Sequence, residues 1–310
     1  MNRHISLLLF IGLVLGQDHF NMSWILADND ILKISPRKTI AQTLTKGWYN
    51  SGKNKNLSAK SVQLSHGIDV SAGGDSAYII RTPSSTFYLE KTGGGLSSML
   101  DIDGVDWLGF RKEEGSGWKG EYRGFPNSIH RQDGNYFHAM NSNTDPSTSV
   151  VEIESDDHVR IVFISSNGRW EGRWDFYVDR CDFTMSKVSD GYKYWVLYEG
   201  VPNGEINETD YWFGSIDDQI REIHEPFSGD LPAPEWIAFG DTRSPRVLYM
   251  FQHEDDDNLD EYYLRPYMTV FGFGRNDGNK YFTTPNTFSI GLVESTDYNE
   301  VQKVVAGIHE

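Results

Sequence analysis

Apolar and polar residues alternate over most of the chain from residue 76 onward. In "SAYIIRTPSSTFYLEK", the apolar residues Tyr78, Ile80, Phe87 and Leu89 are separated by single neighbours. Successive side chains point to opposite faces of a strand, so a period of two predicts strands that bury one face. The same rhythm returns in "STSVVEIESDDHVRIVFISS", "YKYWVLYEGV", "EWIAFGDTRSPRVLYMFQH" and "MTVFGFGRNDGNKYFTTPNTFSIGLVE". The chain is therefore predicted to be rich in strands.

Turn residues separate these predicted strands. They are Gly93 to Gly95, Asp103-Gly104, Asn167-Gly168 and Asn276-Asp277-Gly278. Such residues favour tight hairpin turns. We find no repeat of fixed period, which argues against a β-propeller, the main alternative. We predict an all-β fold, a large twisted antiparallel β-sandwich, over residues 71–310.

Both ends of the chain depart from this pattern. Only "DYNEVQKVVAGIHE" has helical spacing, with Val301, Val304 and Val305 on one face, and it predicts one short C-terminal helix. Residues 1–16 combine a basic start, a short apolar run and a small residue, which is typical of a signal peptide. A buried first strand is the alternative for this segment. Residues 17–70 show no clear period and are predicted to form an arm or linker.

Charge and cysteine content narrow the classes of function. The chain has 310 residues, a net charge of −17 and one cysteine. An acidic surface argues against nucleic-acid binding. No segment after the first is long and apolar enough to span a membrane. Cys181 lies in a strand-like run and is expected to be a core thiol. If the chain is secreted, its lack of disulfides fits a bacterial periplasm or exterior better than a eukaryotic secretory route. Signatures of serine hydrolases, zincins, phosphate loops and dinucleotide binding are missing.

The opening of the predicted sandwich resembles a known family. "FYLEKTGGGLSSMLDIDGVDWLGF", Phe87 to Phe110, places a strand, a glycine turn, a strand, an Asp-Gly turn and a tryptophan in succession. This resembles the first strands of galactose-mutarotase-like β-sandwiches, which include aldose 1-epimerases and domains of polysaccharide lyases. The resemblance implies a carbohydrate in a cleft on the concave face of one sheet, and it leaves the reaction open. It also implies an active-site histidine in the following region, a role for His130 or His138.

That following region carries the side-chain types that a sugar site uses. Rings stack on sugar faces, and chemistry on a uronic acid needs a group that neutralises the carboxylate and a histidine or tyrosine that moves a proton. The candidates are Tyr122, Arg123, Asn127, His130, Tyr136 and His138. A surface loop whose histidines cap turns is the alternative.

Two strand segments add further candidates. In "NGRWEGRWDFY", Trp170 and Trp174 share the face that we expect to be core, while Arg173 lies on the other face and suits a carboxylate. In "YWVLYEGVPNGE", Tyr198 and Glu199 end an apolar strand just before a turn. This is a plausible catalytic position, although a buried glutamate paired with an arginine explains it as well.

The segment "QHEDDDNLDEYY" is dense in carboxylates, which bind Ca²⁺ through oxygen. None of the functions considered for this chain requires a cofactor, but a structural or catalytic Ca²⁺ ion is possible at the aspartates of this segment. The spacing lacks the glycine of an EF-hand loop, so a solvated acidic loop is the alternative. The aspartates are Asp255, Asp256, Asp257 and Asp260. His253, just before them, is a third histidine for a cleft.

Three functions fit these residues. The favoured one is a secreted polysaccharide lyase that cleaves a uronate-containing glycan by β-elimination, with a polysaccharide or oligosaccharide as its partner. The acidic balance of the chain counts against it. The alternative is an aldose 1-epimerase-like enzyme that uses His130 or His138 with Glu199. The third is a non-catalytic carbohydrate-binding protein, in which the titratable groups are structural.

Overall fold

The computed structural model describes residues 25–27, 30–32, 61–70, 75–110, 123–139 and 145–309. The predicted signal peptide and Tyr122 lie outside these residues. The chain divides into two compact units, residues 1–55 and 56–310. In the first, strands β1 (Ile25–Ala27) and β2 (Asp30–Leu32) pair in antiparallel fashion. No helix in the described part is long and apolar enough to cross a membrane.

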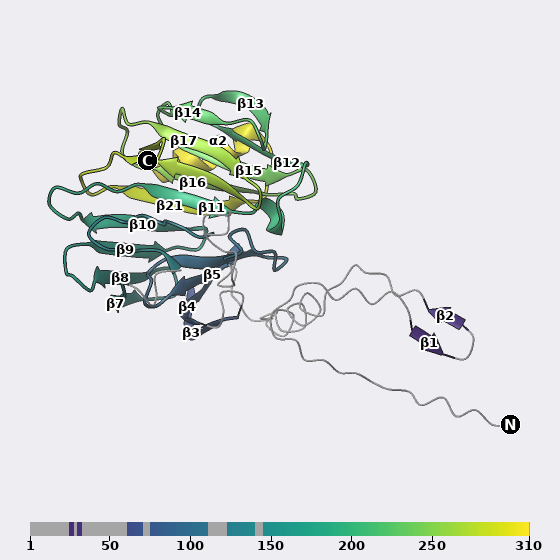
Figure 1. Ribbon diagram of the computed structural model, residues 1–310, viewed down its shortest axis with the longest axis horizontal. Coiled ribbons are helices and arrows are strands. Elements are labelled where there is room, and N and C mark those ends of the chain that lie inside the picture. Colours follow the sequence, from purple (N-terminus) through teal and green to yellow (C-terminus); the bar gives the residue numbers. More distant parts are fainter. Residues whose placement is uncertain are drawn as a thin grey trace. The chain divides into compact units, whose positions relative to one another are not determined.

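A nine-stranded antiparallel sheet forms one layer of the second unit (Figure 1). Its strand order is β13-β12-β15-β16-β21-β10-β9-β8-β7. The strands are β7 (Ser147–Glu154), β8 (Val159–Ser165), β9 (Glu171–Phe176), β10 (Arg180–Lys187), β12 (Asp210–Gly214), β13 (Asp217–Glu222), β15 (Trp236–Asp241), β16 (Val247–Gln252) and β21 (Thr287–Val293).

Two four-stranded antiparallel sheets form the other layer. The first has the order β3-β4-β5-β6, and the second has the order β11-β18-β17-β14. Their strands are β3 (Gln63–Asp69), β4 (Asp75–Arg81), β5 (Ser85–Glu90), β6 (Leu96–Asp101), β11 (Val196–Gly200), β14 (Phe227–Gly229), β17 (Asp260–Arg265) and β18 (Met268–Phe273). A 3₁₀ turn spans Pro202–Gly204, and β19 (Arg275–Asn276) and β20 (Asn279–Lys280) form a small hairpin. Since β3 pairs with β4, the sheet begins before residue 71, where the sequence places the start of the domain.

The facing sides of the two layers share one hydrophobic core. Trp174 and Phe239 from the large sheet pack in the same cluster as Phe87 from β5 and Phe271 from β18. Tyr78, Ile80, Phe87 and Leu89, the alternating residues of the sequence pattern, are all buried. The predicted all-β sandwich is therefore confirmed. Cys181 is also a buried core residue, as expected.

The outer face of the large sheet is covered at one end by the helix α2 (Tyr298–His309). Val301 and Val305 are buried against Trp236, Tyr249 and Phe251. These residues lie on the side of β15 and β16 that faces away from the main core. The predicted C-terminal helix is therefore confirmed, with the predicted apolar face against the sheet.

Strand β11 carries the alternation that positions the site. Val196 and Tyr198 point into the core, so Leu197 and Glu199 point to the outer side of the small sheet. The extended chain at 124–126 pairs along β11: the Glu199 N–H donates to Gly124 O (3.0 Å), and the Leu197 N–H donates to Pro126 O (2.7 Å). The segment 123–139 thereby covers this outer side and buries both side chains.

Candidate functional site

A cavity of about 190 Å³ lies between the segment 123–139 and the outer face of the sheet β11-β18-β17. The segment contributes Asn127, His130, Arg131 and His138, and the strands and their ends contribute Trp195, Leu197, Glu199, Tyr263, Arg265, Val270 and Arg275. Four residues that the sequence nominated, Asn127, His130, His138 and Glu199, are thus brought together around one space.

Glu199 is the buried carboxylate of this cavity. It is 8% exposed, and its Oε2 accepts a 2.5 Å hydrogen bond from Asn127 Nδ2. Burial raises the pKa of Glu199 to about 7, although the Asn127 hydrogen bond and the charges of Arg265 and Arg275 lower it in part. Near neutral pH the carboxyl group therefore exists in both protonation states, as a proton-transfer group requires.

The two histidines of the segment have different surroundings. His138 is 4% exposed, and burial together with the charge of His130 lowers the pKa of His138 to about 3. Its ring is therefore neutral at physiological pH. His130 is half-buried, and burial, followed by the charges of Arg131 and Lys280, lowers its pKa. The cavity thus combines a neutral imidazole with a carboxyl group that titrates near pH 7.

The backbone of the segment is unusual where it holds these side chains. Asn127, Arg131, Asp133 and Phe137 all have positive φ, between 43° and 54°. Non-glycine residues in this region of backbone space cost about 1–3 kcal/mol each, and they cluster at functional sites. Asn127 is the residue type that tolerates the conformation best. The backbone carbonyl oxygen of Asn127 accepts a 2.9 Å hydrogen bond from Trp195 Nε1, which fixes this part of the segment next to strand β11.

Cations and aromatic rings alternate along the strand side of the cavity. The Arg275 guanidinium lies 5.3 Å from the Trp195 ring and 4.9 Å from the Tyr263 ring, and Arg265 lies 5.7 Å from Tyr263. Lys280 Nζ lies 4.4 Å from the centre of the same Trp195 ring. It also donates a 2.7 Å hydrogen bond to the backbone oxygen of His130. Arg275 also pairs with Glu261. Cation–π contacts of this kind fix both partners.

This wall is positive in a chain whose net charge is −17. Arg131, Arg265 and Arg275 line the cavity, and among the described residues Glu199 is its one lining carboxylate. A concentration of one sign of charge around a buried space raises the local concentration of ligands of the opposite sign. The cavity is therefore suited to an acidic ligand.

Two nominated tyrosines lie in the core instead of the cavity. Tyr198 is fully buried, and its hydroxyl donates to Trp107 O at 2.8 Å. It follows from the alternation of β11 that Tyr198 and Glu199 cannot face the same space. Tyr136 is buried, and its hydroxyl lies 3.1 Å from Ser166 Oγ.

Three nominated basic residues lie outside the cavity lining. Arg123 is buried and donates to Gly109 O (3.0 Å) and Tyr267 O (2.8 Å), so it ties loops together. Arg173 lies on the outer face of the large sheet, where it pairs with the buried Asp175 at 2.8 Å. His253, beyond the end of β16, lies 2.7 Å from Ser289 Oγ. Trp170 and Trp174 are core residues, as expected.

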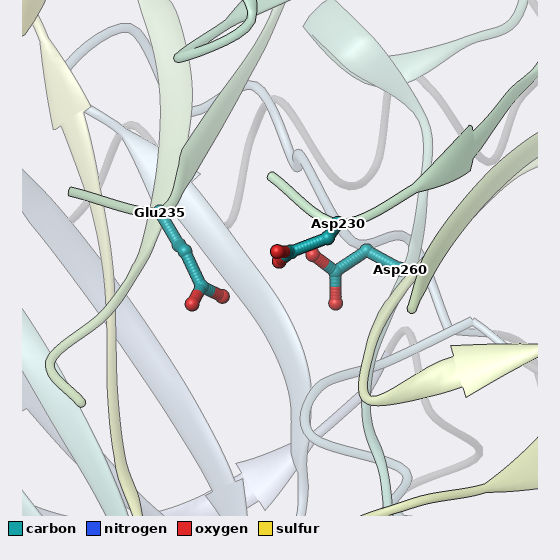
Figure 2. A group of neighbouring side chains, drawn as sticks. All are labelled: Asp230, Glu235 and Asp260. Carbon is teal, nitrogen blue, oxygen red and sulfur yellow. The ribbon is translucent and has the colours of Figure 1, made fainter. Parts of the chain in front are cut away.

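The acidic segment also divides. Asp255 and Asp257 are exposed, which fits the solvated loop, whereas Asp260 is buried at the start of β17. Asp260 lies close to two carboxylates that the sequence analysis did not nominate, Asp230 and Glu235 (Figure 2).

Sequence reasoning missed the strand side of the cavity. Trp195 and Tyr263 lie in segments that were considered for other residues, Arg275 lies in a predicted hairpin, and Arg265 lies in no segment that was considered. In "DEYYLR" the alternation places Tyr262 in the core, so Tyr263 and Arg265 face outward. The available sequence signal was that Tyr263 and Arg265 share the outward face of one strand, where an aromatic ring and a cation can line a binding site.

Comparisons with known proteins support the fold. No protein-family model matches the chain, and no curated protein matches it. Among solved structures, HI1317 matches with a TM-score of 0.50 and 14% identity, over 75% of this chain and 99% of that chain. YeaD from Salmonella typhimurium, described as a proposed mutarotase, matches with a TM-score of 0.46 and 13% identity, over 81% of this chain and 99% of that chain. The chain therefore shares its β-sandwich fold with HI1317.

Proposed function

We propose that the chain is a sugar-converting enzyme of the aldose 1-epimerase type that acts on one sugar unit in the cavity. The observation that carries this proposal is the position of Glu199, a buried carboxyl group with a pKa of about 7 that lines the same cavity as His130 and His138. The galactose-mutarotase-like opening at Phe87 to Phe110 supports the same class.

The size of the cavity favours a single sugar unit over a polymer. Its volume of about 190 Å³ corresponds to about six water molecules at ~30 Å³ each. Pockets for drug-sized ligands begin at about 300 Å³. A lyase that acts within a polysaccharide needs a groove that continues on both sides of the cleaved bond. The volume of the cavity therefore supports a single sugar unit as the substrate in this proposal.

The cavity residues supply both proton transfers of anomer exchange. Neutral His138 accepts the proton of the anomeric hydroxyl, and the protonated carboxyl group of Glu199 donates its proton to the ring oxygen as the bond from C1 to that oxygen breaks. The open-chain aldehyde rotates about the bond from C1 to C2. The ring then closes on the other face, and both protons return. Trp195 and Tyr263 line the cavity and hold the Arg275 guanidinium beside it.

β-Elimination on a uronate is the second candidate, and the arginines favour it. Arg265 and Arg275 on the cavity wall suit a carboxylate, whose neutralisation acidifies the adjacent C–H bond. Neutral His138 would then remove that proton, and the oxygen on the neighbouring carbon would leave with a proton from the carboxyl group of Glu199. The product is an unsaturated uronate that absorbs near 235 nm.

One experiment separates the two. Purified protein is incubated with a panel of neutral aldoses, uronic acids and uronate polymers, and optical rotation and absorbance near 235 nm are recorded in parallel. Accelerated mutarotation without absorbance, lost in His138→Ala, supports the epimerase. Absorbance growth that His138→Ala abolishes supports the lyase. Neither change with any sugar would leave the carbohydrate-binding reading and contradict both enzymes.

A further inference from the structure

Three carboxylates from separate segments converge at one end of the sandwich, away from the cavity lining. Asp230 directly follows β14, Glu235 directly precedes β15, and Asp260 opens β17. One oxygen of each lies within 4.8 Å of an oxygen of the other two. Figure 2 shows the carboxylates of Asp230 and Asp260 close together, with that of Glu235 directed toward the same space.

Two of these carboxylates are buried without a cationic side chain. Glu235 is 2% exposed and Asp260 is 1% exposed. The ion pairs in the described part of the chain involve other carboxylates, such as Asp175, Asp101 and Glu261. Like charges this close require a shared proton or a bound cation.

A second and independent observation is the side chain of Gln252. It is 1% exposed, and its Oε1 has no hydrogen-bond partner in the part of the chain that the structure describes. Its backbone N–H donates to Glu235 O at 2.9 Å, so the two residues are neighbours across β15 and β16. Trp236 and Phe251, the chain neighbours of Glu235 and Gln252, face the helix α2. Because side chains alternate along a strand, Glu235 and Gln252 face the opposite side of the sheet, toward the other layer.

The head group of Gln252 reaches the cluster itself. Its Nε2 donates to Asp256 Oδ2 at 2.7 Å, and the Asp256 N–H donates to Glu235 Oε1 at 2.8 Å. The Gln252 amide, which also donates to Glu254 O at 2.8 Å, is thus linked to the Glu235 carboxyl group through Asp256. An unpartnered buried amide oxygen costs about 1–3 kcal/mol, a cost that a cation at this position would remove.

We propose that Asp230, Glu235, Asp260 and Gln252 Oε1 form a site for a divalent cation of the Ca²⁺ type. Every donor is an oxygen, the set that hard cations prefer, and Ca²⁺ takes six to eight such ligands in irregular geometry. Asp260 is already oriented, because its oxygens accept N–H bonds from Gly274 (2.9 Å) and Leu231 (3.2 Å). Asp230 is exposed, so water completes the coordination on its side.

A cation here joins the two layers of the sandwich. Glu235 leads into β15 of the large sheet, and Asp260 opens β17 of the small sheet. Strand β17 ends with Tyr263 and Arg265, which line the cavity. The site thus holds the strand that carries part of the cavity wall.

The full chain, treated with a chelator and then dialysed, is the sample for the test. Bound Ca²⁺ is counted by elemental analysis, and the melting temperature is followed during Ca²⁺ titration, with Mg²⁺ for comparison. We expect one equivalent of Ca²⁺ and a rise of about 5 °C or more at one hundred times Kd. Asp230→Asn, at an exposed position that tolerates change, is expected to weaken Ca²⁺ binding at least tenfold.

The matched control is Asp255→Asn, an exposed aspartate of the neighbouring acidic loop, which is expected to bind Ca²⁺ as the wild type does. A wild-type protein that takes up no Ca²⁺ and does not melt higher in its presence would overturn the proposal and leave a shared proton as the explanation. Equal losses in Asp230→Asn and Asp255→Asn would also overturn it, because the binding would then be diffuse.

Discussion

The side-chain amide of Asn127 donates a 2.5 Å hydrogen bond to the carboxylate of Glu199, a residue 72 positions further along the chain. The bond joins the covering segment to strand β11 inside the cavity. It favours the ionised form of Glu199, whereas burial favours the protonated form, and burial is the larger effect. The Asn127–Glu199 pair thus sets the pH at which the carboxyl group changes charge.

Removal of this hydrogen bond is predicted to shift the pH dependence of activity. In Asn127→Ala, the pKa of Glu199 rises because the stabilising amide is lost. If protonated Glu199 donates the proton to the ring oxygen, wild-type kcat/KM falls as pH rises through about 7, and that of the variant falls at higher pH. Rates from pH 5 to 9 measure the shift. Asn299→Ala, at an exposed position of the C-terminal helix, is the control, and an unshifted profile in Asn127→Ala would refute this role.

The same carboxyl group is predicted to make stability depend on pH. The pKa of Glu199 is about 7 in the folded chain, above its ordinary 4.5, so folding favours the protonated form. Its contribution is fully present below pH 4.5 and is lost as pH rises through about 7. Relative to Glu199→Gln, the wild type should lose about 3 kcal/mol of unfolding free energy between pH 4 and 8. Urea unfolding at both pH values checks this, and parallel curves for the two proteins would contradict it.

Arg275 is predicted to select acidic sugars. Hydrogen bonds to charged groups contribute about 1.5–3 kcal/mol, so Arg275→Gln should lower kcat/KM for a uronic acid about 10- to 150-fold. The effect on the matching neutral sugar should be much smaller. Arg173→Gln, which removes an arginine on the outer face of the large sheet, is the control. Equal losses for acidic and neutral sugars would show that Arg275 acts only through packing with Trp195 and Tyr263.

Gly93 is predicted to be required for the position of His138. A Cβ at Gly93 would overlap the carbonyl oxygen of His138, and the His138 N–H donates to Gly93 O at 3.1 Å. Gly93→Ala should therefore displace His138, destabilise the fold by about 1–3 kcal/mol and reduce activity. Gly307→Ala, in open space on the C-terminal helix, should leave both unchanged. Thermal unfolding and activity of the two variants decide whether this close contact matters.

The regular part of the fold could be predicted because its signals are local. Alternation identified Tyr78, Ile80, Phe87 and Leu89 as buried, and the spacing of Val301 and Val305 identified the helix. The start of the sheet at β3 was missed because "QLSHGID" shows little apolar content on either face. Its place is set by pairing with β4 and not by its own pattern.

The site could be predicted only on the segment 123–139 and at Glu199 of strand β11. Asn127, His130, His138 and Glu199 carried recognisable chemistry, but the wall opposite them depends on the strand order β11-β18-β17. Because of that order, Tyr263 and Arg265 line the same cavity as Asn127, although they are separated from it in the sequence by more than a third of the chain length. No local sequence pattern encodes this contact. The prediction for Arg173 failed for the same reason. Alternation correctly placed its side chain on the face opposite Trp174, but that face is the outer side of the large sheet and does not line the cavity.

The rate of anomer exchange, measured by exchange NMR on α and β forms of acidic and neutral aldoses, tests the central claim most directly. The account predicts acceleration by the wild type and by the exposed control Glu222→Gln, and a loss of at least 100-fold in Glu199→Gln, the range of one general acid–base contribution. Exchange as fast in Glu199→Gln as in the wild type would contradict the assignment of Glu199, and no acceleration by any form would contradict the epimerase proposal.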